Sequence, residues 1–259
     1  MSDGRLRNRR ALVTGGDSGI GRATCKRLAM DGARVAVNYR SDEEAAHGIV
    51  AEITQEGGDA LAIQADVSQE EDVVGMFGRL AEDLGGPVDL LVNNAGVEKP
   101  FKLVDMPLEE WDKVIAVNLT GAFLCARETA KGLIDRGDPG VIVNVSSVHE
   151  LIPWREFSHY CASKGGMKLF GQSIAYELAP HKIRVVSIGP GAIITPINEE
   201  MLEDPDQRRE VEEQIPWGRL GRAEEVAAAI AWISGPEAEY ITGVTLFVDG
   251  GMTLYPKFV

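Results

Sequence analysis

Short apolar runs alternate with longer segments of helical periodicity along almost the whole chain. The runs are rich in aliphatic and β-branched residues, as expected for strands covered on both faces. The predicted strands are 10–14, 34–39, 60–65, 88–92, 141–145, 184–188 and 244–248, and the predicted helices are 22–30, 42–56, 108–131, 160–178 and 223–233. This alternation predicts an α/β fold with one doubly wound parallel sheet.

Chain length and one irregular segment complete the predicted organisation. A length of 259 residues with 44% apolar residues suits a single domain, which we assign to 1–259. The stretch 195–217 is rich in Pro, Asp and Glu and does not fit the alternation. Irregular segments of this length often cover active sites, so we interpret 195–217 as a substrate lid containing short helices.

Charge and hydropathy argue against several classes of partner. The formal net charge of −14 opposes binding to nucleic acid or anionic lipid, because both surfaces are negatively charged. No apolar run approaches the roughly 20 residues that span a bilayer, and Met1–Arg10 lacks the apolar segment of a signal peptide. The cysteines show no metal-binding spacing. We therefore expect a cytoplasmic protein without a metal site that binds a small molecule, and neither nucleic acid nor membrane.

A glycine-rich turn follows the first predicted strand and opens the first helix. It reads Thr14-Gly15-Gly16-Asp17-Ser18-Gly19-Ile20-Gly21, a TGxxxGxG spacing. Glycines let the backbone approach a pyrophosphate at a helix N-terminus, although such a turn can also be a structural bend. A carboxylate would repel phosphate, so we expect Asp17 to cap the helix or to face solvent. The predicted cofactor contacts here are Gly15, Asp17, Ser18, Gly19, Ile20 and Gly21.

The end of the second predicted strand bears on which dinucleotide binds. NAD-selective sites usually place an acidic residue there to bind the ribose hydroxyls. Tyr39 takes that place here, while Arg40 and Ser41 can hydrogen-bond a 2′-phosphate. The alternative is that Arg40 is simply solvated. We predict that NADP is accepted and that NAD is also used.

Tyr160 and Lys164 are four residues apart on a predicted helix, which places both side chains on one face. A free tyrosine has a pKa of about 10, and a nearby ammonium favours the phenolate that a base requires. The pair alone is common on helices. However, Ser146-Ser147 and Asn93-Asn94-Ala95-Gly96 each end a predicted strand, where open α/β sheets bind ligands. These segments predict an active site at that edge of the sheet.

The ordered motifs TGxxxGxG, NNAG, a helical Asn, a Ser and YxxxK resemble those of the short-chain dehydrogenase/reductase family over essentially the whole chain. The resemblance implies a Rossmann-like domain in which Ser147 holds the substrate oxygen and Tyr160 is the acid/base. Lys164 would bind the nicotinamide ribose and depress the tyrosine pKa. Asn118 would position a water that links the lysine to solvent, although a helical Asn can simply bond a neighbouring carbonyl.

The same resemblance implies further cofactor contacts. Asp66 and Val67 would meet the adenine, Asn93 the adenosine ribose, and the segment 190–195 the carboxamide. Together with the strand-end loop and the catalytic pair, these contacts are Asp66, Val67, Asn93, Ala95, Gly96, Tyr160, Lys164, Pro190, Gly191, Ile193 and Thr195. The implied cofactors are NADP and NAD.

More narrowly, the segments 38–41, 146–150, 152–154, 160–168 and 241–256 resemble those of bacterial glucose 1-dehydrogenases. This resemblance implies oxidation of the anomeric hydroxyl of an aldose such as glucose to the lactone, by hydride transfer to the nicotinamide. The implied substrate contacts are Glu98, Ser147, His149, Tyr160 and Asn198, whose side chains can hydrogen-bond hydroxyls.

Other interpretations of these positions remain open. Glu98, His149 and Asn198 could equally serve local turns and caps. Trp154, Phe157 and Trp217 could wall a sugar ring, although loop aromatic residues are often packing anchors. The alternative enzyme is an NADPH-dependent reductase of small ketones or 3-oxoacyl substrates, and a third alternative is a nucleotide-sensing scaffold without turnover. The resemblance also implies a homotetramer.

Overall fold

The structure is a computed structural model that describes residues 4–196 and 204–254. At its centre is a seven-stranded sheet in the order β3-β2-β1-β4-β5-β6-β9, with every neighbouring pair parallel. The strands are β1 Arg10–Val13, β2 Arg34–Tyr39, β3 Asp59–Gln64, β4 Leu90–Asn93, β5 Gly140–Val145, β6 Ile183–Pro190 and β9 Thr245–Val248. The order reverses between β1 and β4, which confirms the doubly wound fold.

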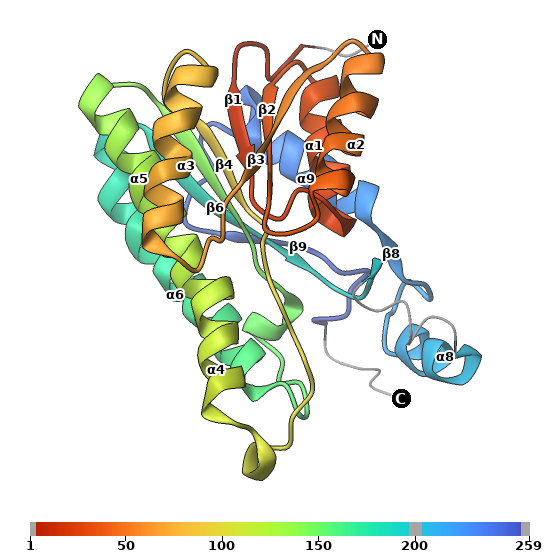
Figure 1. Ribbon diagram of the computed structural model, residues 1–259. Helices are drawn as coiled ribbons and strands as arrows, with labels where there is room; N and C mark the ends of the chain where they lie inside the picture. The colour runs from red at the N-terminus through yellow and green to blue at the C-terminus, as the bar shows by residue number, and fades with distance from the viewer. Residues whose placement is uncertain (1–3, 197–203, 255–259) are drawn as a thin grey trace.

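Helices cover both faces of this sheet (Figure 1). On one face lie α1 Gly19–Met30, α2 Glu43–Gln55 and α9 Ala223–Ser234, and on the other lie α3 Glu70–Asp83, α5 Gly121–Arg136 and α6 Ser158–Leu178. α3 lies where no helix was predicted from the sequence. Gly75 and Gly78 weaken its helical pattern, but Val73, Met76 and Leu80 form a buried stripe that holds it on the sheet.

The predicted helix 108–131 is divided in the structure. α4 Leu108–Ile115 passes through a π-helical turn, Ala116–Thr120, before α5 begins. Asn118 in this turn accepts the Val97 N–H at 2.8 Å and donates its Nδ2 to the Val97 carbonyl at 3.0 Å. A side chain that ties a helix to a loop disturbs the regular backbone ladder, a break that periodicity does not reveal.

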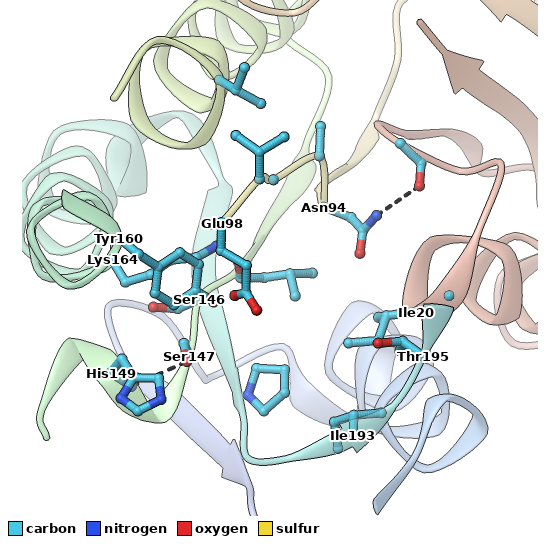
Figure 2. A pocket seen from close by; sticks show the side chains of 18 of the residues that line it. Ile20, Asn94, Glu98, Ser146, Ser147, His149, Tyr160, Lys164, Ile193 and Thr195 are labelled. Carbon is cyan, nitrogen blue, oxygen red and sulfur yellow. Dashed lines mark hydrogen bonds between the residues drawn. The ribbon is translucent and has the colours of Figure 1, made fainter. Parts of the chain in front are cut away.

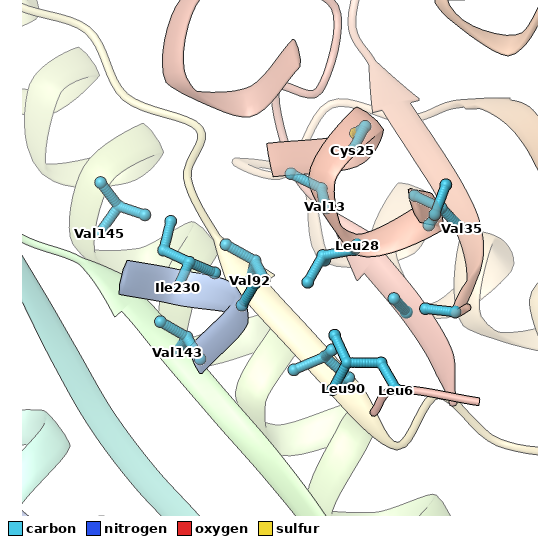
Figure 3. Close-up of a cluster of buried hydrophobic side chains, with 14 of the residues drawn as sticks. Leu6, Val13, Cys25, Leu28, Val35, Leu90, Val92, Val143, Val145 and Ile230 are labelled. Carbon is cyan, nitrogen blue, oxygen red and sulfur yellow. The ribbon is translucent and has the colours of Figure 1, made fainter. Parts of the chain in front are cut away.

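Two apolar clusters bury the faces of the sheet. On the first face Leu28 of α1 and Ile230 of α9 pack near Val92 of β4 (Figure 3). On the second face the cluster includes Leu80 of α3 and Leu133 of α5. Because both faces are packed, the carboxyl ends of the strands are the edge left for a ligand.

Shorter elements complete the described chain. They are η1 Leu103–Asp105, η3 Val148–Glu150, η4 Ala179–His181, α8 Pro205–Glu213, η6 Pro236–Ala238 and the paired strands β7 Ile193–Ile194 and β8 Gly221–Arg222. α4 and α8 lie on opposite sides below the sheet (Figure 1). Within residues 4–196 and 204–254, no helix is long and apolar enough to cross a membrane.

Candidate active site

A cavity of about 1010 Å³ runs along the carboxyl ends of the central strands. Of the residues predicted to bind cofactor or substrate, those that line it are Gly15, Asp17, Ser18, Gly19, Ile20, Arg40, Ser41, Asp66, Val67, Ala95, Gly96, Glu98, Ser147, His149, Tyr160, Lys164, Pro190, Gly191, Ile193 and Thr195. Ligand pockets commonly reach about 1,000 Å³, so this space is large enough for a dinucleotide and the reacting end of a substrate.

Four predicted residues do not line this cavity, namely Gly21, Tyr39, Asn93 and Asn118. Tyr39, predicted at the acid position, has its side chain buried in the core, because alternate residues of β2 point to opposite faces, while Asn38 and Arg40 reach the cavity. Asn93 is buried and donates to the Asn144 Oδ1 at 2.9 Å. The predicted substrate contact Asn198 lies outside the described residues.

The glycine turn is packed backbone to backbone against its surroundings. Gly15 and Gly19 have φ values of +57° and +49°, which residues with a Cβ rarely adopt. The Asn94 Nδ2 donates to the Gly15 carbonyl at 2.9 Å. A Cβ on Gly21 would collide with that carbonyl oxygen and lie 2.6 Å from the Asn94 Nδ2. The turn therefore holds the start of α1 close to the end of β4.

The N-terminus of α1 faces the cavity without a capping side chain. Ser18 is the N-cap and makes no side-chain capping hydrogen bond, while Gly19 and Ile20 line the cavity. Backbone N–H groups in this arrangement can bind an anion. One interpretation predicted that Asp17 caps the helix. Asp17 does not do so, and its side chain is half-buried in the cavity wall. Burial raises the pKa of its carboxyl, and the charge of Arg40 partly offsets that rise.

Ser147, Tyr160 and Lys164 converge at the other end of the cavity (Figure 2). Ser147 begins η3, and its Oγ accepts the His149 N–H at 3.2 Å. The Lys164 Nζ lies 5.5 Å from the centroid of the Tyr160 ring and donates to the Val145 carbonyl at 2.8 Å. A hydroxyl, a phenol and an ammonium thus meet beside the end of β5.

Burial is the largest effect on the pKa values of Tyr160 and Lys164 at this end of the cavity. Burial raises the pKa of the Tyr160 phenol, the Glu98 charge adds to the rise, and the Ser147 hydroxyl lowers it. Burial also lowers the pKa of Lys164 to about 8, against the raising effect of Glu98. Desolvation is the largest effect on the pKa of Tyr160, and the lowering of that pKa by Lys164 stays a prediction. With a pKa of about 8, Lys164 loses its charge just above neutral pH.

Asn118 lies behind the cavity wall and connects two of its parts. Besides its bonds to Val97, its Nδ2 donates to the Ser163 Oγ at 3.2 Å, and that hydroxyl donates to the Tyr160 carbonyl at 2.7 Å. The side chain therefore ties the loop that carries Glu98 to the helix that carries Tyr160. The carbonyl that it binds belongs to Val97, 21 residues away, and not to a neighbouring residue of the helix, while the water link stays a prediction.

Glu98 and an aromatic stack form the wall near Tyr160. The His149 ring stacks on Trp154 with centroids 4.6 Å apart, and Trp154 stacks on Phe157 with centroids 3.7 Å apart. Burial lowers the pKa of His149, so its imidazole is neutral at pH 7. Burial likewise raises the pKa of Glu98, while Lys164 lowers it. Trp217, predicted as a third aromatic wall, is exposed and does not line the cavity.

Several polar residues of the cavity were not predicted. They are Asn38, Asn94, Ser146, Gln207 and Gln214. Asn94 could have been found from the NNAG motif, and Gln207 and Gln214 from their spacing of seven on one helical face. Within the part of the chain that the structure describes, no group of His, Cys, Asp and Glu could hold a metal ion.

Comparisons with known proteins agree with this geometry. The family model described as enoyl-(acyl carrier protein) reductase matches residues 15–253. A crystal structure of a short-chain type dehydrogenase/reductase from Mycobacterium marinum has a TM-score of 0.91 at 38% identity and covers 96% of this chain and 97% of that one. The chain belongs to the short-chain dehydrogenase/reductase family. It is therefore an oxidoreductase by family.

Relatives within the short-chain dehydrogenase/reductase family act on different substrates. The chain is 48% identical to 3beta-hydroxysteroid dehydrogenase 1 of Eggerthella lenta, over 98% of this chain and 97% of that protein. It is 40% identical to glucose 1-dehydrogenase 2 of Bacillus subtilis, over 97% of both proteins. A gluconate 5-dehydrogenase from Burkholderia cenocepacia, solved with NADP and tartrate, has a TM-score of 0.91 at 30% identity and covers 97% of this chain and 98% of that one.

Proposed function

We propose that this short-chain dehydrogenase/reductase interconverts a hydroxyl and a carbonyl group of a small substrate at the end of the cavity near α6. The observation that carries the proposal is the meeting of Ser147, Tyr160 and Lys164 beside one cavity that also reaches the glycine turn. Ser147 donates a hydrogen bond to the substrate oxygen, and Tyr160 exchanges a proton with it. The charged Lys164 favours the phenolate of Tyr160.

The cofactor is NADP or NAD, and the residues present fit it. The positive φ of Gly15 and the close approach at Gly21 hold the glycine turn against the end of β4, and the uncapped start of α1 faces the cavity, where its N–H groups can bind a pyrophosphate. When bound, the nicotinamide supplies the hydride chemistry. Arg40 is exposed at the cavity rim and, with Ser41, would hold a 2′-phosphate.

Arg40→Gln is expected to raise the KM for NADP at least about tenfold, because one charge-assisted contact to the 2′-phosphate is lost. The KM for NAD should change less than about twofold, since NAD lacks that phosphate. Initial rates at varied cofactor concentration provide the measurement. Arg136→Gln, a change of equal charge at an exposed position on α5, is the control. Equal changes in both KM values would contradict this role.

A sugar is the substrate that the polar groups of the site favour. The Glu98 carboxyl is held in the wall near Tyr160 and can accept hydrogen bonds from more than one hydroxyl. Gln207 of α8, its C-cap Gln214 and the neutral His149 add donors and acceptors. We propose that the enzyme oxidises the anomeric hydroxyl of an aldose such as glucose to the lactone, an activity that one relative's name also gives.

A steroid hydroxyl is a second candidate. The stacked rings of His149, Trp154 and Phe157 form a flat aromatic wall, which suits a fused apolar ring system. The relative from Eggerthella lenta is named as a 3beta-hydroxysteroid dehydrogenase. The third candidate, a 3-oxoacyl reductase, is the activity named for a relative from Synechocystis that is 39% identical, but the net charge of −14 opposes it mildly.

Glu98→Gln distinguishes these substrates. For an aldose we expect kcat/KM to fall at least about tenfold, because the amide is a weaker acceptor than the carboxylate. For a 3β-hydroxysteroid or a 3-oxoacyl substrate the change should be smaller. The measurement follows the absorbance of reduced nicotinamide with glucose, other aldoses, steroids, ketones and acyl substrates, with the exposed Glu109→Gln as control.

A loss that is equal for all substrates would mean that Glu98 acts through Tyr160 and Lys164 and makes no sugar contact. Activity on steroids alone would discard the sugar assignment and keep the proposed chemistry. No activity with any hydroxyl or carbonyl compound, in a folded protein that binds NADP, would overturn the proposed function and favour a scaffold.

We also propose a lid and an assembly. Gln207 and Val211 of α8 and its C-cap Gln214 line the cavity, which supports a lid role for 195–217 from the part that the structure describes. Phe123 on α5 and Leu169 and Tyr176 on α6 are exposed, which supports burial of these helices in a homotetramer. Light scattering would test the assembly, and a monomeric mass would contradict it.

A further inference from the structure

Glu150 is a buried carboxylate immediately behind the candidate active site. It ends η3, and its side chain is 0% exposed. Its Oε2 accepts the Ser146 hydroxyl at 2.7 Å. Its Oε1 has no hydrogen-bond partner among the described residues and lies 3.7 Å from the Lys168 Nζ. A buried carboxylate so incompletely paired is costly and depends on nearby cations.

Two lysines near Glu150, Lys164 and Lys168, lie on successive turns of α6. Lys168 is 28% exposed, so solvent screens its charge, and its distance from the Oε1 exceeds that of a hydrogen bond. Lys164 is 4% exposed, and its Nζ donates to the carbonyl of Val145, the residue before Ser146. Charges that interact through buried protein are screened less than charges at the surface.

The charges that act on Lys164 come from separate elements. Glu98 reaches it from the loop after β4, and Glu150 reaches it from η3. Tyr160, whose ring centroid lies 5.5 Å from the Lys164 Nζ, is kept protonated by burial, and the neutral His149 meets that ring in an edge contact. The two carboxylates are therefore the groups that oppose loss of the Lys164 proton, and of these only Glu98 lines the cavity.

We propose that Glu150 is a positioning residue, which holds the loop of Ser146 and Ser147 against α6 and keeps Lys164 charged. The inference rests on the proposed function, because it assigns a task to a group behind the proposed reaction centre. Ser146 is the mechanical link, since it joins the Glu150 carboxylate to the segment that carries Ser147. Glu150 needs no contact with substrate or cofactor for this role.

Glu150→Gln tests the electrostatic part, because the amide has nearly the same shape and still accepts from Ser146 but carries no charge. A carboxylate raises the pKa of a nearby ammonium, so its removal should lower the pKa of Lys164 below its value of about 8. The alkaline limb of kcat/KM should therefore move to lower pH by about half a unit or more. Turnover below pH 7 should change less than about threefold, since Lys164 stays protonated there.

A second readout does not depend on turnover. The ¹³Cε signal of Lys164 in lysine-labelled protein, assigned by its loss in Lys164→Met, reports the titration directly. It should move in Glu150→Gln by the same amount as the kinetic limb. Glu177→Gln removes one charge from the same helix about 20 Å away and should leave both readouts unchanged. Lys168→Gln removes a neighbouring cation and should not move the limb to lower pH.

Two results separate the possible failures. If Glu150→Gln lowers Tm and turnover at every pH while the Lys164 titration stays in place, Glu150 serves only the fold and the inference is overturned. If the Lys164 titration moves as expected in a protein that converts no hydroxyl or carbonyl compound, the coupling stands and the proposed function fails.

Discussion

Tyr160→Phe is expected to lower kcat about a thousandfold with every substrate, while the fold and cofactor binding are retained. The phenol is the proposed proton donor and acceptor, and removal of a positioned acid/base commonly costs between about a hundredfold and ten-thousandfold. The ring itself stays, so its edge contacts with His149 and Trp154 persist. Steady-state kinetics and fluorescence titration with NADPH provide the two measurements.

Tyr240→Phe is a matched control outside the cavity. Tyr240 is fully exposed in the turn after η6, so removal of its hydroxyl should change neither kcat nor stability. If Tyr160→Phe retained more than about a tenth of the activity, another group would be moving the proton, and the role of Tyr160 would have to be abandoned. An unchanged cellular effect of Tyr160→Phe, despite lost turnover, would support the scaffold alternative.

Gly21→Ala is expected to destabilise the protein by about 2 kcal/mol or more and to abolish tight dinucleotide binding. The added Cβ would meet the Gly15 carbonyl oxygen and the Asn94 Nδ2 at 2.6 Å, and both belong to rigid parts of the site. The start of α1 would have to separate from the glycine turn that faces the cavity. Chemical denaturation measures the loss of stability, and calorimetry with NADP measures binding.

For Gly48→Ala we expect the stability of the protein to increase instead of decrease. Gly48 lies in the interior of α2, is exposed, and has nothing within 4 Å of an added Cβ. The substitution should stabilise the protein by roughly 0.5–1 kcal/mol, because alanine loses less backbone entropy on folding. If Gly21→Ala were as harmless as Gly48→Ala, the close packing of the glycine turn would not be needed for binding.

The strands were predicted well because they are buried on both faces. β2 has the predicted bounds, β1, β5 and β9 differ from theirs by one residue at one end, and β3 differs by one residue at each end, since continuous apolar runs leave little choice of register. α3 was missed because its glycines obscure a stripe formed by Val73, Met76 and Leu80. A weak helical pattern can thus be fixed by tertiary packing.

The parts of the site that sequence did not reveal depend on contacts between distant segments. The break at Asn118 arises from its bonds to Val97, a partner 21 residues away that periodicity cannot indicate. A cofactor contact was predicted for Tyr39 because it ends the second strand, where NAD-selective sites usually carry an acidic residue. The pleat of β2 points its side chain into the core. The partial pairing of Glu150 with Ser146 and Lys168 is likewise visible only once η3 is packed on α6.

The division of the cavity along the chain has a consequence for how such enzymes diverge. The glycine turn and the ends of β2 and β3 supply one end of the cavity, and 145–164 supplies the reacting groups at the other. The surrounding wall comes from the loop after β4, the aromatic segment 149–157 and α8. After gene duplication, mutations in these wall segments can change the substrate, while Ser147, Tyr160, Lys164 and the glycine turn stay the same.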